Sequence, residues 1–151
     1  MGKSEFSEDL KLIRSSEVYE RMRFQRHHCN TTLLKHVLSV ARVSGNIARV
    51  LKKAGVKVHE RELYVAAICH DMGMTDRYNK SVYPTHMDLA VKHGERSVYY
   101  LKSILGERYS EKEGQIIRYH MFPMLAPPRC IEGWILIAAD KFRTVMDFFR
   151  L

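Results

Sequence analysis

The sequence contains few of the residues that interrupt helices: its 151 residues include only eight glycines and four prolines. Glycine and proline are the least favourable residues in a helix interior, so their scarcity leaves long stretches free to be helical. No run of apolar residues approaches the roughly 18 needed to cross a bilayer, which argues against a membrane protein. The N-terminal segment also lacks the apolar core of a secretory signal.

Cysteine is scarce as well, with isolated residues at Cys29, Cys69 and Cys130 and no C-x-x-C spacing. An odd number without such spacing argues against a disulfide framework. We therefore expect free thiols and a cytoplasmic protein.

Basic residues outnumber acidic ones by 25 to 17, which gives a formal net charge of +8. This excess favours acidic partners such as phosphate esters, nucleotides, nucleic acid or a membrane surface, although a solvated basic surface is equally compatible with it. No block of five or more like charges occurs, so we predict no nucleic-acid-binding tail. The chain has the length and the hydrophobic content (46%) of a single domain with its own core.

Apolar residues recur at helical spacing along most of the chain, and no segment alternates long enough to predict a strand. The sequence therefore predicts an all-α fold, a single compact bundle of about six helices. The predicted helices cover residues 7–26, 33–54, 60–70, 91–105, 110–121 and 131 to the end. Residues 72–90 are predicted to form a long connection, and connections of that length are often functional.

Several helix ends are predicted from capping residues. Asn30, Thr31 or Thr32 is expected to cap the second helix, since their side-chain oxygens accept from free backbone N–H groups. Gly55 is expected to end that helix. Ser110 followed by Glu113 is the capping-box pattern and predicts a helix start.

The pair His70-Asp71 follows the apolar segment AAIC and precedes Gly73 and a polar loop. Burying a carboxylate without compensation is costly, and a divalent cation compensates it directly. A solvated helix end is the alternative for the dipeptide alone.

Other titratable residues occupy similar positions on apolar helices. His36 lies on the stripe that includes Leu33 and Val40, where a hydrogen-bonded core histidine is the alternative. Asp140 stands among apolar residues of the last helix, where a buried salt bridge is the alternative. Two further histidines, His93 and His120, lie at the start of one helix and the end of another. Imidazoles and carboxylates from facing helices commonly form metal sites in helix bundles.

The order H…HD…D, formed by His36, His70-Asp71 and Asp140, resembles the HD superfamily of metal-dependent phosphohydrolases, in particular its small single-domain bacterial members. The resemblance extends over about residues 24–146 and implies a helical bundle around the metal. It implies that these four residues bind a first metal. It also implies that His93 and His120 bind a second metal or contact phosphate, with Asp71 bridging the two ions. The implied cofactor is one or two divalent ions of Mn, Fe, Ni, Co or Zn, and Mg is a further candidate.

Two features depart from relatives within that superfamily. The GYP-bearing motif of the cyclic-dinucleotide phosphodiesterases is absent. Where many HD enzymes have a lysine soon after the HD pair, this chain has Met74 and Asp76. We assign Asp76 an acid–base or supporting role, beside Asp71, His93 and His120 as catalytic candidates.

Phosphate binding requires cations near the metal, and arginine suits it because its planar fork meets two phosphate oxygens. The candidates are Arg26, His28, Arg96 and Lys141, with Arg23 and Lys92 as further basic residues. His86, in the long connection, is an alternative to His93 in the second metal site.

The sequence thus predicts hydrolysis of a phosphate mono- or diester, a nucleotide or another small phosphorylated metabolite. The alternative is a non-catalytic HD module that binds metal and nucleotide for regulation. We expect neither a membrane nor a nucleic acid as partner. Phe148, Phe149 and Leu151 are expected to dock on the domain or on a second subunit, which would make a homodimer.

Overall fold

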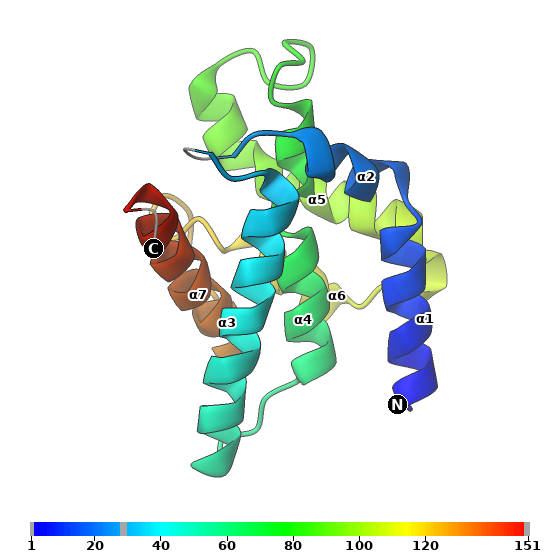
Figure 1. Cartoon of the computed structure of the whole chain (residues 1–151), viewed down its shortest axis with the longest axis vertical. Helices are drawn as coiled ribbons and strands as arrows, with labels where there is room; N and C mark the ends of the chain where they lie inside the picture. Colours follow the sequence, from blue (N-terminus) through cyan, green and yellow to red (C-terminus); the bar gives the residue numbers. More distant parts are fainter. Residues whose placement is uncertain (1, 28–29, 150–151) are drawn as a thin grey trace.

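The computed structural model describes residues 2–27 and 30–149, and within these it contains seven α-helices and no β-strand (Figure 1). The prediction of an all-α bundle is confirmed. The helices are α1 (Lys3–Arg14), α2 (Glu17–Phe24), α3 (Leu33–Lys53), α4 (Glu60–Cys69), α5 (His86–Leu105), α6 (Glu111–Arg118) and α7 (Ile131–Phe148). Two short 3-10 helices, η1 (Met72–Asp76) and η2 (Gly106–Arg108), follow α4 and α5.

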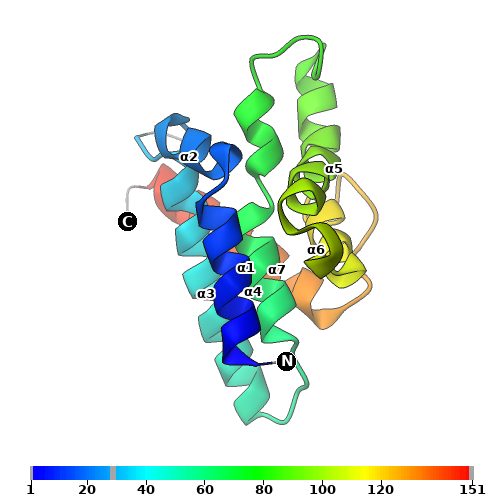
Figure 2. The same cartoon turned by 90° about the vertical axis from the view of Figure 1, so that its right-hand side faces the viewer.

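Helix α4 lies at the centre, between α3 and α7 on one side and α6 on the other (Figures 1 and 2). Its second half is buried on all sides, as its sequence predicted. Ala66 and Ala67 are completely buried there, and such small side chains let neighbouring helices approach closely. Because α4 ends at Cys69, the residues that follow it begin in the interior of the protein.

The predicted first helix, 7–26, is instead two helices, so the estimate of about six helices is one too low. The break falls at Ser15 and Ser16. The Ser16 side chain accepts a hydrogen bond from the Tyr19 N–H and so caps α2. Serine competes with the helix backbone in this way, and the apolar periodicity alone did not reveal it.

The predicted connection 72–90 is shorter than expected, because η1 occupies its start and α5 begins at His86 rather than at 91. Thr85 and Asp88 form a capping box at that start. Asp fills the position where Glu or Gln is typical, so the usual capping-box pattern did not predict this helix start.

Other predicted boundaries are confirmed. Thr32 caps α3, and Ser110 forms its capping box with Glu113. Gly55 has a positive φ of 87° just after α3, a conformation that glycine adopts without strain.

Cys69 and Cys130 are free thiols, whereas Cys29 lies outside the described residues.

At the end of α7, Phe148 and Phe149 are 70% and 63% exposed, so they do not dock on the domain. Leu151 lies outside the described residues. Among the helices of the described ranges, none is long and apolar enough to cross a membrane.

Candidate metal centre

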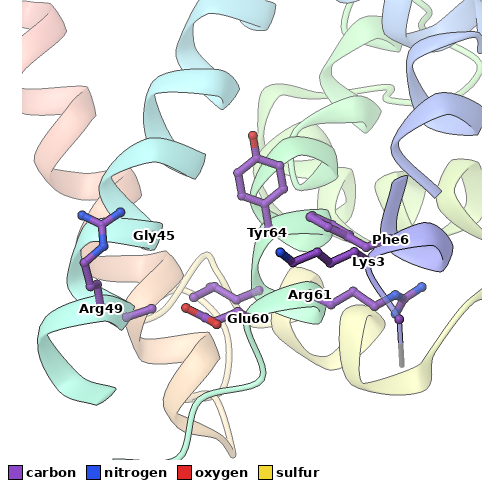
Figure 3. Close-up of a pocket in the computed structure, with 10 residues that line it drawn as sticks. Lys3, Phe6, Gly45, Arg49, Glu60, Arg61 and Tyr64 are labelled. Atoms are coloured by element: carbon purple, nitrogen blue, oxygen red, sulfur yellow. The ribbon is translucent and has the colours of Figure 1, made fainter. Parts of the chain in front are cut away.

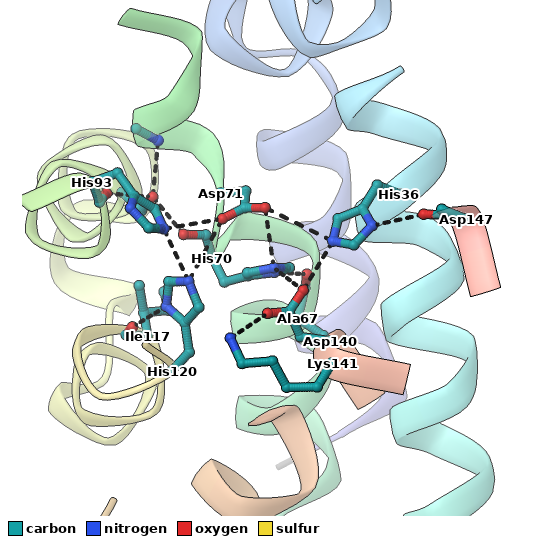
Figure 4. A network of polar contacts seen from close by, with 12 residues as sticks. His36, Ala67, His70, Asp71, His93, Ile117, His120, Asp140, Lys141 and Asp147 are labelled. Atoms are coloured by element: carbon teal, nitrogen blue, oxygen red, sulfur yellow. Dashed lines mark hydrogen bonds and ion pairs between the residues drawn. The ribbon is translucent and has the colours of Figure 1, made fainter. Parts of the chain in front are cut away.

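Four buried side chains from α3, α4 and α7 converge at one point (Figure 4). His36 comes from α3, His70 and Asp71 follow the end of α4, and Asp140 comes from α7. The His36 Nε2 lies 2.9 Å from Asp140 Oδ1 and 3.9 Å from Asp71 Oδ2. The His70 Nε2 lies 3.4 Å from Asp71 Oδ2 and 3.5 Å from Asp140 Oδ1. We call these four residues the α3/α7 group.

A second group of buried side chains also contains Asp71. Its two histidines lie near Asp71 Oδ1, whereas the first group lies near Oδ2. His93 on α5 and His120, just after α6, bring their Nε2 atoms within 3.0 Å of each other. Asp71 Oδ1 lies 3.3 Å from the His93 Nε2 and 3.6 Å from the His120 Nε2. We call Asp71, His93 and His120 the α5/α6 group, and Figure 4 shows Asp71 between the two groups.

All four imidazoles are oriented by a hydrogen bond at the other ring nitrogen. The Nδ1 of His70, His93 and His120 lies 2.8, 2.9 and 2.6 Å from the carbonyl oxygens of Ala67, Leu89 and Ile117. A carbonyl oxygen only accepts, so each of these Nδ1 atoms donates. The neutral tautomer therefore leaves each Nε2 lone pair directed into the centre, which is how metal-binding histidines are held.

His36 is oriented differently, by a carboxylate. Its Nδ1 lies 3.1 Å from Oδ2 of Asp147, which is in the last turn of α7. Asp147 is itself held by Arg143, whose Nη2 donates to the other carboxylate oxygen at 2.8 Å. A carboxylate behind an imidazole raises the basicity of the ligand and fixes its ring.

The charge balance of the centre requires a cation. Burial on its own raises the pKa of the Asp71 carboxyl, but the charge of His70 and the hydrogen bonds of the imidazoles outweigh it and hold that pKa well below its usual range. The Asp140 pKa is held low in the same way, chiefly by His36 and His70. Burial lowers the pKa of His70, yet the two carboxylates reverse this and raise it well above 6.5. Protons or a metal ion must therefore sit between these nitrogens and oxygens.

The spacing of the ligand atoms fits a metal ion. Bonds of about 2.1 Å to an ion place neighbouring ligand atoms about 3.0 to 3.5 Å apart. Most of the separations within both groups lie near that range, and all the ligand atoms of a group are within 4.8 Å of one another. Among the described residues, the completely buried His70 Nε2 has only the Asp71 and Asp140 carboxylate oxygens near it, at 3.4 and 3.5 Å, and neither contact meets hydrogen-bond geometry, as expected of a ligand atom aimed at an ion.

Close backbone packing holds Asp71 between the two groups. The Ser97 hydroxyl on α5 donates to the carbonyl oxygens of His70 and His93 and accepts from the Gly73 N–H. A Cβ at Gly73 would lie 2.2 Å from the His93 carbonyl oxygen, so only glycine allows η1 to approach α5 this closely. The buried Tyr83 hydroxyl donates to the Gly73 carbonyl oxygen and closes this contact.

A cavity of about 250 Å³ opens onto both groups and is lined by Asp71, His93, His120 and Asp140. Lys141 and His86 also line it, and the Lys141 Nζ lies 3.5 Å from Asp140 Oδ2. Met74, which stands where many HD enzymes have a lysine, contributes an apolar wall. The structure thus brings His93 into the α5/α6 group and leaves His86 on the wall of the cavity.

Three of the predicted site residues, Asp76, Arg96 and Arg26, lie elsewhere. Asp76 accepts hydrogen bonds from Arg21, Arg96 and Tyr100, so the Arg96 guanidinium is engaged with Asp76 and neither residue lines the cavity. The expected position of Arg96, beside the metal centre, is therefore wrong, because its charge is paired with that of Asp76. The acid–base or supporting role of Asp76 stays a prediction. Arg26 is exposed and does not line the cavity, and His28 lies outside the described residues. The further candidates Arg23 and Lys92 pair with Glu20 and Asp88.

Two residues near the centre were not predicted from the sequence. Asp147 follows Asp140 by seven residues, which places both on one face of a helix, and this spacing was the available signal. His27 lines the cavity with its ring centroid 4.1 Å from that of His36. It stands next to the predicted His28, in a segment whose conformation no periodic pattern specified.

Comparison with known proteins agrees with this geometry. The family model for the HD domain matches residues 33–144, which contain every residue of both ligand groups. No curated protein and no solved structure gives a match. The chain belongs to the HD domain family, a superfamily of metal-dependent phosphohydrolases.

Proposed function

We propose that the protein hydrolyses a small phosphate ester, such as a nucleotide or another phosphorylated metabolite, with two divalent metal ions. The observation that carries the proposal is the position of Asp71, whose two oxygens face separate ligand groups. A carboxylate shared in this way is suited to hold two ions at the short separation used in phosphoryl transfer.

Imidazole and carboxylate ligands together favour a first-row transition metal over magnesium, which prefers oxygen ligands alone. We therefore expect Mn, Fe, Co, Ni or Zn. When bound, such ions supply an activated water and neutralise charge on the phosphoryl oxygens. The His70, His93 and His120 side chains hold their positions through backbone carbonyl oxygens, so the ligands are arranged before an ion arrives.

The remaining cavity residues suit a small phosphate ester. Lys141 lines the cavity with a half-exposed side chain, and its ammonium is available to a phosphate oxygen at the cost of one 3.5 Å ion pair. The volume of about 250 Å³ lies just below the roughly 300 Å³ lower bound of common ligand pockets, which favours a compact substrate. The formal net charge of +8 attracts anions toward the protein in general.

The test combines metal analysis with an activity screen. The purified protein is analysed for bound metals and then assayed against a panel of phosphate mono- and diesters with Mn, Co, Ni, Fe, Zn or Mg. We expect hydrolysis with at least one transition metal, and we expect His70→Ala to abolish both the activity and most of the metal content. His59→Ala is the matched control. His59 lies at the start of α4, the end away from His70, where it contacts Glu132 of α7, and it belongs to neither ligand group.

Metal that binds without hydrolysis of any ester, together with nucleotide binding, would favour the regulatory module instead. An unchanged metal content in His70→Ala would show that the ligand assignment is wrong.

A further inference from the structure

A second cavity, of about 420 Å³, lies between α1, α3 and α4, away from both ligand groups (Figure 3). Helix α1 packs chiefly on α5 and not on α3, which leaves a space between α1 and α3. Residues of α4 line the bottom of this space. None of its lining residues lines the cavity at the metal centre. It is therefore a separate site and does not depend on the proposed function.

The wall of this cavity contains a glycine that the fold does not require. Gly45 lies in the middle of the 21-residue helix α3, where glycine is the least favourable residue except proline. Its φ is not positive, and a Cβ placed there meets no heavy atom within 4 Å. By contrast, Gly73 is required because a Cβ there would collide with the backbone. A side chain at Gly45 would instead project into the cavity, so the glycine keeps this space open.

Aromatic rings form the opposite side. Phe6 of α1 and Tyr64 of α4 pack edge to face, with ring centroids 5.7 Å apart, and both remain partly exposed. An edge-to-face pair offers a ring face and a ring edge to a third flat group. This part of the cavity suits an aromatic body.

The charges around the cavity do not cancel. Glu60 is paired with Lys52, and Arg61 is paired with Asp9 and Glu113. Figure 3 shows the Arg61 guanidinium directed away from Arg49. Within the described residues, Lys3 and Arg49 have no acidic partner, and Arg49 donates only to the Asn46 side chain at 3.3 Å. Two cations therefore remain for an anionic group.

We propose that this cavity is a binding site for a small aromatic anion, whose ring lies against Phe6 and Tyr64 and whose negative group meets Lys3 and Arg49. The open space at Gly45, the aromatic wall and the uncompensated cations each point to one part of such a ligand. Glu60 is the one acid among the described residues that line the cavity, and it is already paired with Lys52.

Naphthalene-1-sulfonate is a suitable probe, because it has the ring and the charge but no phosphate ester that the metal centre would hydrolyse. Binding is followed by amide chemical shifts of the full-length protein. We expect saturable shifts at Gly45 and Tyr64, with none at His36 or His93. Methanesulfonate, which lacks the ring, and naphthalene-1-methanol, which lacks the charge, should each bind about tenfold more weakly.

Three variants make the assignment specific. Gly45→Leu fills the cavity and should abolish binding, while it leaves the protein folded, since leucine favours helices and the added side chain meets open space. Arg49→Gln should weaken binding about tenfold. Arg42→Gln removes the same charge from an exposed position of the same helix, seven residues away, and should bind as the original protein does.

Equal affinity in the original protein and in Gly45→Leu and Arg49→Gln would overturn the proposal. The absence of saturable binding of naphthalene-1-sulfonate in the millimolar range would overturn it too, as would a control compound that binds as tightly as naphthalene-1-sulfonate does. If Gly45→Leu fails to fold, the contrast between Arg49→Gln and Arg42→Gln decides. A failure here leaves metal content and ester hydrolysis untouched.

Discussion

The two ligand groups use the same imidazole chemistry but differ in charge. The α3/α7 group has two carboxylates, Asp71 and Asp140, and a third, Asp147, behind His36. The α5/α6 group has only its share of Asp71, and its two histidines are oriented by neutral carbonyl oxygens. Both groups share the charge of Asp71, but only the α3/α7 group adds a whole carboxylate, Asp140, so it neutralises more of the charge of a divalent cation. We therefore expect the α3/α7 group to hold its ion more tightly and the α5/α6 group to exchange its ion more readily.

Removal of the shared ligand, Asp71, should abolish the difference in metal affinity, because both groups should then lose their ions. We expect Asp71→Ala to lose nearly all bound metal from both groups, because each loses a carboxylate oxygen within 4 Å of its imidazoles. Metal content by mass spectrometry is the measurement. Asp76→Asn is the matched control: it loses the negative charge and one of the two oxygens that accept from Arg21, Arg96 and Tyr100, which should cost about 1 to 3 kcal/mol of stability, and it should retain its metal. Retention of metal by Asp71→Ala would refute the shared-ligand interpretation.

Removal of a ligand from the α5/α6 group alone should remove its ion and leave the ion of the α3/α7 group bound. His93→Ala and His120→Ala should each lower the metal stoichiometry by about one ion per chain and leave the α3/α7 group filled. His86→Ala, which removes a histidine from the cavity wall, should keep the full stoichiometry. Unchanged stoichiometry in both ligand variants would show that only the α3/α7 group binds an ion.

The carboxylate behind His36 should affect one group alone. Asp147→Ala should lower the metal affinity of the α3/α7 group by about 10- to 100-fold, the usual effect of losing a partner of a ligating histidine. Asp147→Asn should fall between, since its amide oxygen still accepts from the imidazole but carries no charge. Metal titrations of both variants provide the test, and an equal loss at the α5/α6 group would contradict it.

The pH dependence of metal affinity should also distinguish the two groups. Burial lowers the pKa of His36, but the Asp140 hydrogen bond and the Asp71 charge outweigh it, so the net pKa is raised above 6.5, as it is for His70. Below these raised pKa values protons occupy the nitrogens, so affinity of the α3/α7 group should rise with pH through and above neutrality, by at most about tenfold per unit for each proton displaced. Burial instead lowers the pKa of His120, whose ligand form therefore persists to lower pH. Titrations at several pH values should show a weaker dependence for the α5/α6 group.

The parts that the sequence predicted share one property: they lie on strongly apolar helices. Helical periodicity located α3, α4 and α7, and a histidine or aspartate among buried apolar residues needs a partner, which drew attention to His36, His70 and Asp140. Their assembly around one point is what the structure adds. Their roles as ligands stay predictions until metal is measured.

The errors concern polar residues whose partners come from other elements. Arg96 was predicted to bind phosphate because a guanidinium suits that ligand. Its partner Asp76 lies on η1, and Arg21 of α2 completes the cluster. A charge on an exposed or half-exposed helix face has many possible partners, and sequence spacing does not choose among them. The same reason explains why Asp147 was overlooked although it shares a face with Asp140.

The order of the ligands along the chain also sets an order for assembly during synthesis. Asp71, His93 and His120 all precede α7, so the α5/α6 group is complete once the ribosome has released that part of the polypeptide. The hydrogen bond between His36 and Asp140 joins residues 104 positions apart and cannot form until α7 has emerged and docked. If both groups bind ions as proposed, we expect a nascent chain to complete its weaker site first and to capture the tightly held ion only when the last helix closes the bundle.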